Sequence, residues 1–250
     1  MNATLRLARA ELRKLFTTRA LPVSFAIAIV LAVGSVIIDA MVAGTNGSPR
    51  LGTDAGVYQM LKVGAITCVV MLILGILAAG SEFRHRTIVP SLLATPHRAR
   101  VFAVKVAVVA ALGAASGAVI FGLGLGTVVV ELSAHGIHHL PAGVTSLYVG
   151  TVISSACFGM IGVALGALTR STIGAIVAAI GWTLVVEEII LQTVAPHLDK
   201  WLPTGAAIGL TNAPSPGHSL SPTAAGLVLT GYAIALLVAA TRTTMRRDVA

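Results

Sequence analysis

Two acidic residues, Glu187 and Glu188, interrupt an otherwise apolar stretch at residues 173–194. A carboxylate at the centre of a bilayer costs about 2.5–3.5 kcal/mol, so such groups normally face protein or water, where they can relay protons or line a transport path. Neighbouring residues on a helix point about 100° apart, so the two cannot serve one pocket equally. Together with Trp182 they are candidate residues of a translocation path, unless the helix is broken or already leaves the membrane here.

Three histidines, His135, His138 and His139, lie close together, with Glu131 one turn before them. Their spacing allows two imidazoles to share a metal ion, but a zinc site normally gathers a third or fourth ligand and a second shell of hydrogen bonds. A loop that contains glycine and adjoins Pro141 favours solvated histidines instead. We therefore expect no metal site, and no cofactor of any kind, in this chain.

Motifs of common enzymes do not occur in the 250 residues. The phosphate-binding pattern Gly-x-x-x-x-Gly-Lys-Ser/Thr is missing, and so are His-Glu-x-x-His, Gly-x-Ser-x-Gly and a dinucleotide-binding fingerprint. Cys68 and Cys157 each lie inside an apolar stretch, which predicts buried free thiols. We therefore do not expect this chain to be an enzyme or to hydrolyse ATP by itself.

The elements that position these residues are predicted to be membrane helices, because 56% of the residues are hydrophobic, 10% are charged and the mean hydropathy is +0.93. Uninterrupted apolar stretches of about 20 residues fit helices that cross a bilayer and exclude the alternating pattern of a β-barrel. We predict an all-α integral membrane protein that forms a single transmembrane domain over residues 1–250. Its six transmembrane helices are expected at about 21–43, 58–80, 101–130, 147–168, 173–194 and 223–241.

Glycines four residues apart recur in the third and fourth predicted spans. Such pairs let two helix backbones approach closely in a membrane. We interpret them as sites of packing within the chain, at Gly113 and Gly117, Gly122 and Gly126, and Gly162 and Gly166.

The basic residues indicate the orientation of the bundle. With six spans, 14 of the 17 Lys and Arg residues fall on the side that holds both termini. Cytoplasmic flanks retain positive charge, so both termini are predicted to be cytoplasmic. Because the basic residues cluster beside the spans and have no interleaved aromatic residues, the net charge of +8 does not indicate a nucleic-acid partner.

The segment before the first span has the pattern of an amphipathic helix. Five apolar residues recur there at helical spacing, and arginines occupy the adjoining face: Leu5, Ala8, Leu12, Leu15 and Phe16, beside Arg6, Arg9 and Arg13. This pattern predicts a helix at the cytoplasmic membrane interface whose basic side faces lipid headgroups or a partner. The simpler alternative is a positively charged flank with no further role.

The predicted cytoplasmic loop between the second and third spans has the signals of a short helix. Thr87 is a suitable N-cap, Pro90 is tolerated in a first turn and Pro96 ends the helix. Its apolar residues share one face: Ile88, Val89, Leu92 and Leu93. From these features alone, the helix is equally suited to dock a partner protein and to lie on the membrane.

These segments together resemble the permeases of type-2 ABC exporters, in an actinobacterial-like branch. The resemblance includes the run Glu82-Phe83-x-x-x-Thr87-Ile88-x-x-x-Leu92-Leu93-x-Thr95-Pro96-x-Arg98, followed by Lys105. It also includes Glu11-Leu12-x-Lys14-Leu15-x-Thr17-x-Arg19 near the start, and Trp182, Glu187 and Leu202-Pro203-x-Gly205 near the end. Six spans with both ends inside cover the whole chain in the order of that family.

The resemblance implies a membrane subunit of a bacterial exporter in the cytoplasmic (inner) membrane. Two permeases, either identical or sister chains, would pair around a path lined by spans two and five, and two separate ATPase subunits would bind ATP and Mg below them. The loop helix would be a coupling helix in a groove of the ATPase, with contacts from Glu82, Phe83, Arg84, Thr87, Ile88, Leu92, Leu93, Thr95 and Pro96. The N-terminal helix would lie against the same ATPase through Arg6, Arg9, Glu11, Leu12, Lys14 and Leu15.

The same resemblance implies that residues 196–213 fold back as a short external or re-entrant helix. It does not indicate the cargo, although apolar walls of a path would suit a drug, a lipid or a peptide alike. A proton-coupled secondary transporter or a channel that uses Glu187 and Glu188 is the main alternative. A membrane scaffold or sensor without transport is the weaker one.

Overall fold

The structure of this protein is a computed structural model, which describes residues 3–45, 47–84, 98–169, 171–191, 196–211 and 220–246. Every regular element within these ranges is a helix. Five helical segments are long and apolar enough to cross a membrane, which fits an all-α, multi-pass membrane protein. They comprise α2 (Ala20–Val42), α3 (Asp54–Met60) with α4 (Val63–Arg84), α6 (Arg98–Ala134), α7 (Val144–Thr169) and α12 (Pro222–Arg246).

The segment predicted as the fifth span has a different form. It begins as α8 (Thr172–Ile180) and continues as the π-helix η1 (Gly181–Leu191). Its apolar part is shorter than the other five and ends at Glu187. The change of helix type at Gly181 and the acidic pair shorten the apolar stretch, so a sixth span stays a prediction.

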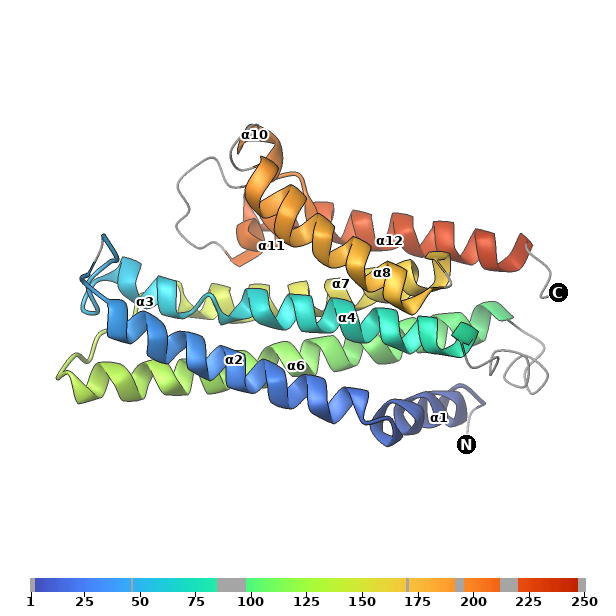
Figure 1. Cartoon of the computed structure of the whole chain (residues 1–250), viewed down its shortest axis with the longest axis horizontal. Helices are drawn as coiled ribbons and strands as arrows, with labels where there is room; N and C mark the ends of the chain where they lie inside the picture. Colours follow the sequence, from blue (N-terminus) through green and yellow to red (C-terminus); the bar gives the residue numbers. More distant parts are fainter. Residues whose placement is uncertain are drawn as a thin grey trace.

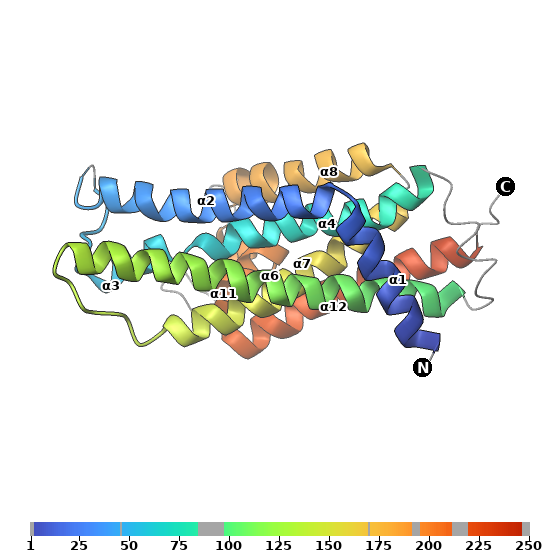
Figure 2. The same cartoon turned by 90° about the horizontal axis from the view of Figure 1, so that it is seen from below.

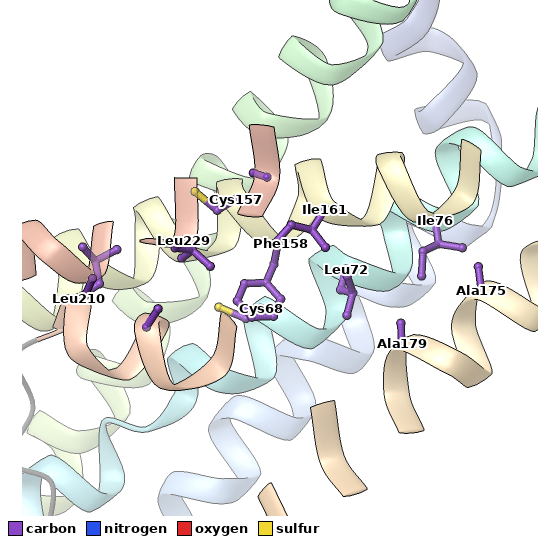
Figure 3. Close-up of a cluster of buried hydrophobic side chains, with 13 residues drawn as sticks. Cys68, Leu72, Ile76, Cys157, Phe158, Ile161, Ala175, Ala179, Leu210 and Leu229 are labelled. Atoms are coloured by element: carbon purple, nitrogen blue, oxygen red, sulfur yellow. The ribbon is translucent and has the colours of Figure 1, made fainter. Parts of the chain in front are cut away.

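The helix α7 is the centre of the bundle and packs against α4, α6, α11 (Pro203–Thr211) and α12 (Figure 1). Its residues contribute to all three hydrophobic clusters of the core. Figure 3 shows one cluster, in which side chains of α7 meet those of α4, α8, α11 and α12. Cys68 and Cys157 lie in this cluster as buried free thiols, as predicted.

Small residues decide how closely the central helices approach. A Cβ atom at Gly162 would meet the backbone of α4 at Leu72 and Gly75, and one at Gly113 would meet the backbone of α7 at Ser155. Two of the predicted glycine pairs, 113/117 and 162/166, therefore pack within the chain. The prediction is wrong for the pair 122/126, because both of its glycines are exposed and have open space where a Cβ would lie.

The helix α1 (Ala3–Thr17) and the C-terminal end of α12 lie at the same end of the bundle (Figures 1 and 2). The loop around Gly136, which ends α6 with a left-handed residue (φ +70°), lies at the opposite end. The segment predicted to fold back contains two short helices, α10 (Pro196–Asp199) and α11. Which end of the bundle faces the cytoplasm stays a prediction from charge.

We predict that Gly162→Ala destabilises the folded bundle by about 1–3 kcal/mol, because the added methyl overpacks a contact between two backbones. The matched control is Gly122→Ala, which adds the same methyl to a helix face with open space. It should leave the stability unchanged or slightly raise it. Unfolding of the two variants in detergent measures the difference, and equal stabilities would contradict this account of the α4–α7 contact.

Candidate functional site

The helix α1 lies across one end of α6 (Figure 2). Its amphipathic pattern determines which of its faces is turned towards the bundle. Ala8, Leu12 and Leu15 are half-buried towards the bundle, while the arginines of the predicted basic face, Arg6, Arg9 and Arg13, are exposed. Leu5 and Phe16, the outer members of the apolar set, are more than half exposed. The predicted helix is confirmed, and part of its apolar face is covered by protein rather than by lipid.

A buried ion pair fastens α1 to the bundle. Glu11 is only 4% exposed and Lys105 of α6 is 5% exposed. The Lys105 ammonium donates to Glu11 Oε2 at 2.6 Å and to the backbone oxygen of Ala78 in α4 at 3.3 Å. Lys14, one turn further along α1, donates to Glu11 Oε1 at 2.7 Å. One carboxylate therefore joins α1 to α6, and the ammonium bonded to it continues the connection to α4.

This ion pair lies beside the two helices that flank the predicted coupling loop. Ala78 precedes the end of α4 at Arg84, and Lys105 follows the start of α6 at Arg98. Glu82, Phe83 and Arg84 are in the last turn of α4, although the described part of the structure does not include their side chains. The other predicted coupling residues lie outside the described residues: Thr87, Ile88, Leu92, Leu93, Thr95 and Pro96.

Sequence reasoning did not foresee the pairing of Glu11 with Lys105. It placed both residues in the family motifs but assigned them no contact with each other. The available signal was that Glu11 is the only acidic residue before Asp39, and that Lys105 lies inside the start of an apolar stretch. A buried ammonium requires a partner, but many carboxylates could have supplied it before the helices were placed.

The surroundings of Glu11 keep it ionised. Burial alone raises the pKa of the Glu11 carboxyl, but the Lys105 ammonium and the hydrogen bonds from Lys105 and Lys14 outweigh this effect, so the pKa is held below its ordinary value. The folded protein therefore binds this proton less readily than the unfolded chain does. It follows that the ion pair contributes its full stability above the ordinary pKa of a glutamate and loses it as the pH falls.

Trp182 and Glu187, two residues of the second predicted site, differ in their burial. Glu187 is fully buried in η1, and its Oε2 accepts a hydrogen bond from the backbone N–H of Thr204 in α11 at 2.8 Å. Trp182, in the first turn of η1, is half-exposed. The side chain of Glu188 lies outside the described residues. The structure thus brings Glu187 against α11, a contact that sequence reasoning missed, and its role in a transport path stays a prediction.

Two of the three histidines in the loop after α6 contact nearby groups of the same protein. His135 Nδ1 lies 2.9 Å from the backbone oxygen of Glu131, and His139 Nε2 lies 2.7 Å from Asp54 Oδ1 at the start of α3. Within the part of the chain that the structure describes, no group of three His, Cys, Asp or Glu side chains is arranged to hold a metal ion. The His139–Asp54 pair instead connects this loop to α3.

No known family model matches the chain, and no curated protein matches it either. Chemically, the ion pair offers a fixed, dry connection rather than a reactive centre, because the Glu11 carboxylate is occupied by two ammonium groups. The candidate functional site is therefore the junction of α1, α4 and α6 around Glu11 and Lys105, which we call the Glu11 clamp.

We predict that Glu11→Gln lowers the free energy of unfolding by about 3–5 kcal/mol, because it leaves the Lys105 ammonium buried without its anionic partner. The control Lys14→Met removes a half-exposed contact of the same carboxylate and should cost about 1 kcal/mol or less. Replacing both buried partners, Glu11→Leu with Lys105→Met, should recover part of the loss. Denaturation in detergent measures all three, and an equal cost for Glu11→Gln and Lys14→Met would refute the clamp.

The stability of the clamp should also depend on pH, with a defined sign. Between pH 8 and 5 the parent protein should remain more stable than Glu11→Gln by a constant amount. Below about pH 4, where a glutamate becomes protonated, the difference should shrink towards zero because the parent then carries the same neutral side chain. Unfolding of both proteins across this pH range tests the sign, and a difference that grew on acidification would contradict it.

Proposed function

We propose that this chain is the permease subunit of an ATP-driven type-2 ABC exporter in a bacterial cytoplasmic membrane, and that it works as a dimer with two copies of a separate ATPase. The observation that supports this most directly is the Glu11 clamp. Its buried ion pair connects α1 with α6, and Lys105 also bonds α4, so one cluster of contacts joins α1 to the two helices that precede and follow residues 85–97 in the sequence. Because the clamp joins the helix before this segment to the helix after it, a displacement imposed by a partner would reach both helices.

The helix contacts provide a route by which such a displacement would reach the core. Residues 85–97 connect the end of α4 to the start of α6, and both helices pack against the central helix α7 at glycine contacts. Close backbone contacts transmit displacement well, because few side chains lie between the helices to absorb it. Binding of ATP by the partner would thereby change the packing of α4 and α6 and open the path alternately to the two sides.

The proposed roles of the permease and the ATPase follow from the motifs in this sequence. No phosphate-binding loop occurs in its 250 residues, so ATP and Mg would be bound by the ATPase. A second permease copy, or a sister chain, would cover the apolar stripe along α8 and η1, where Ile173, Val177 and Leu184 are exposed. The same stripe would be covered by lipid if the partner bound elsewhere. A transport path with apolar walls would suit a drug, a lipid or a peptide as cargo.

The predicted coupling contact can be tested by Leu92→Asp combined with Leu93→Asp. These changes should abolish recovery of the ATPase in a pull-down without affecting membrane insertion, because they place two charges where apolar side chains would enter the ATPase groove. The matched control is His135→Ala with His138→Ala at the opposite end of the bundle, which should leave recovery unchanged. The coupling role is wrong if the ATPase still binds the double Asp variant.

A proton-coupled transporter or channel is the second candidate function, and the burial of Glu187 favours it. A fully buried acidic residue in an apolar helix is a common feature of proton relays. The distinguishing measurement is transport in vesicles that contain the purified chain. Movement of cargo that needs the ATPase and ATP supports the exporter, whereas movement that follows a proton gradient without ATP supports the alternative.

A further inference from the structure

The helix η1 is only lightly attached to the rest of the bundle. Its main contacts are with α8, which precedes it, and with the short helices α10 and α11, which follow it. Figure 1 shows η1 diverging from α4 and α7 towards α10. Four of its large apolar side chains are half-exposed or more: Trp182, Leu184, Val185 and Ile189. Packing against the core therefore contributes little to holding η1 in place.

The helix α11, in contrast, is firmly part of the bundle. Ala206 and Leu210 are buried in the core cluster shown in Figure 3. A Cβ atom at Gly150 of α7 would meet the backbone of α11 at Thr211, so these two helices approach backbone to backbone. A group on η1 that binds α11 would consequently fasten a loosely packed helix to a fixed one.

Glu187 is such a group. Its Oε2 accepts the N–H of Thr204 in the first turn of α11, where backbone N–H groups have no partner within their own helix. A carboxylate at this position satisfies the free donor and interacts favourably with the helix dipole. Burial of the whole side chain excludes the water that would otherwise compete for this N–H.

Two further atoms at this contact are notable. Glu187 Oε1 and Thr204 Oγ1 are both buried, and neither makes a well-formed hydrogen bond with a described residue. A buried polar atom without a partner carries a desolvation cost. The contact therefore has both a favourable bond that holds it closed and unsatisfied groups that would gain partners if it opened to water.

The start of η1 offers a place for such a movement. The α-helical pattern of α8 changes to the wider π-helical pattern at Gly181, where a Cβ atom would meet nothing within 4 Å. Glycine lowers the cost of changing the backbone, and local π-helical turns are frequent at functional sites.

We propose that Glu187 is a tether, which caps the N-terminus of α11 from a neighbouring helix and holds η1 against the bundle until the bond is released. Release lets η1 swing about Gly181. The tether acts through the hydrogen bond that the backbone N–H of Thr204 donates to Glu187 Oε2. The proposal concerns the conformation of this chain alone and does not require the ATPase or a cargo.

The test measures the position of η1 directly. Spin labels are attached at Val185→Cys in η1 and Leu227→Cys in α12, two exposed positions, in a background with Cys68→Ala and Cys157→Ala. Pulsed electron resonance on the full chain in lipid nanodiscs then reports the distance distribution between the labels. With Glu187 present, we expect one narrow distance.

Removing the acceptor with Glu187→Leu should raise the share of a second, displaced distance roughly tenfold, which corresponds to about 1.4 kcal/mol. Glu187→Gln should keep the narrow distance, because its amide oxygen can still accept the Thr204 N–H, and its amide N–H can donate to the Thr204 hydroxyl oxygen. Thr183→Val is the matched control, since its buried hydroxyl bonds only to Ala179 and Ile180 within its own helical segment. It should leave the distance unchanged.

Size-exclusion chromatography shows whether each variant is folded. If Glu187→Leu is not monodisperse, Glu187→Asn replaces it, because its side chain is one carbon too short to reach Thr204, and the same tenfold change is expected. An unchanged distance in the Leu or Asn variant would overturn the tether. So would a displacement in Glu187→Gln or Thr183→Val as large as that in Glu187→Leu, because the effect would then not come from this hydrogen bond.

Discussion

A buried ammonium that must have an anionic partner is the constraint on which the arrangement of this protein depends. Lys105 lies inside the bundle, where an unpaired charge costs several kcal/mol, and Glu11 compensates it from a helix that is otherwise mostly exposed. This requirement places α1 across the end of α6. The bond from the same ammonium to Ala78 adds α4, so one charged group contacts three helices at the end of the bundle that holds α1.

Away from this end, the bundle is held by the fit of backbones rather than by charges. Lipid removes most of the hydrophobic drive between helices, so close approach through small residues supplies much of the packing. Gly162 and Gly75 bring α7 and α4 together, and Gly113 brings α6 against α7. The central helices consequently form a compact unit, to which α8 and η1 are added at one side (Figure 1). A displacement at the clamp would reach the core through these contacts.

Among the described residues, two buried acidic side chains illustrate two ways of accommodating a carboxylate. Glu11 is paired with two ammonium groups and accepts hydrogen bonds at both oxygens. Glu187 accepts a backbone N–H at the start of α11, and its other oxygen makes no well-formed hydrogen bond within the described residues. The first arrangement suits a permanent attachment. The second suits a contact that is made and broken, so the end that holds α1 is rigid and the contact between η1 and α11 is adjustable.

Local sequence pattern determined the class of the fold and most of its helices, because hydropathy and helical spacing depend only on neighbouring residues. The amphipathic helix α1, the apolar helices and the buried thiols follow from it. Tertiary structure alone decided which partner Lys105 has and which glycines lie at contacts between helices. The pair Glu11–Lys105 spans 94 positions, and the glycine pairs 113/117 and 122/126 have the same spacing on one helix although only the first is packed. Such choices depend on which helices become neighbours, and that is set by the packing of the whole chain.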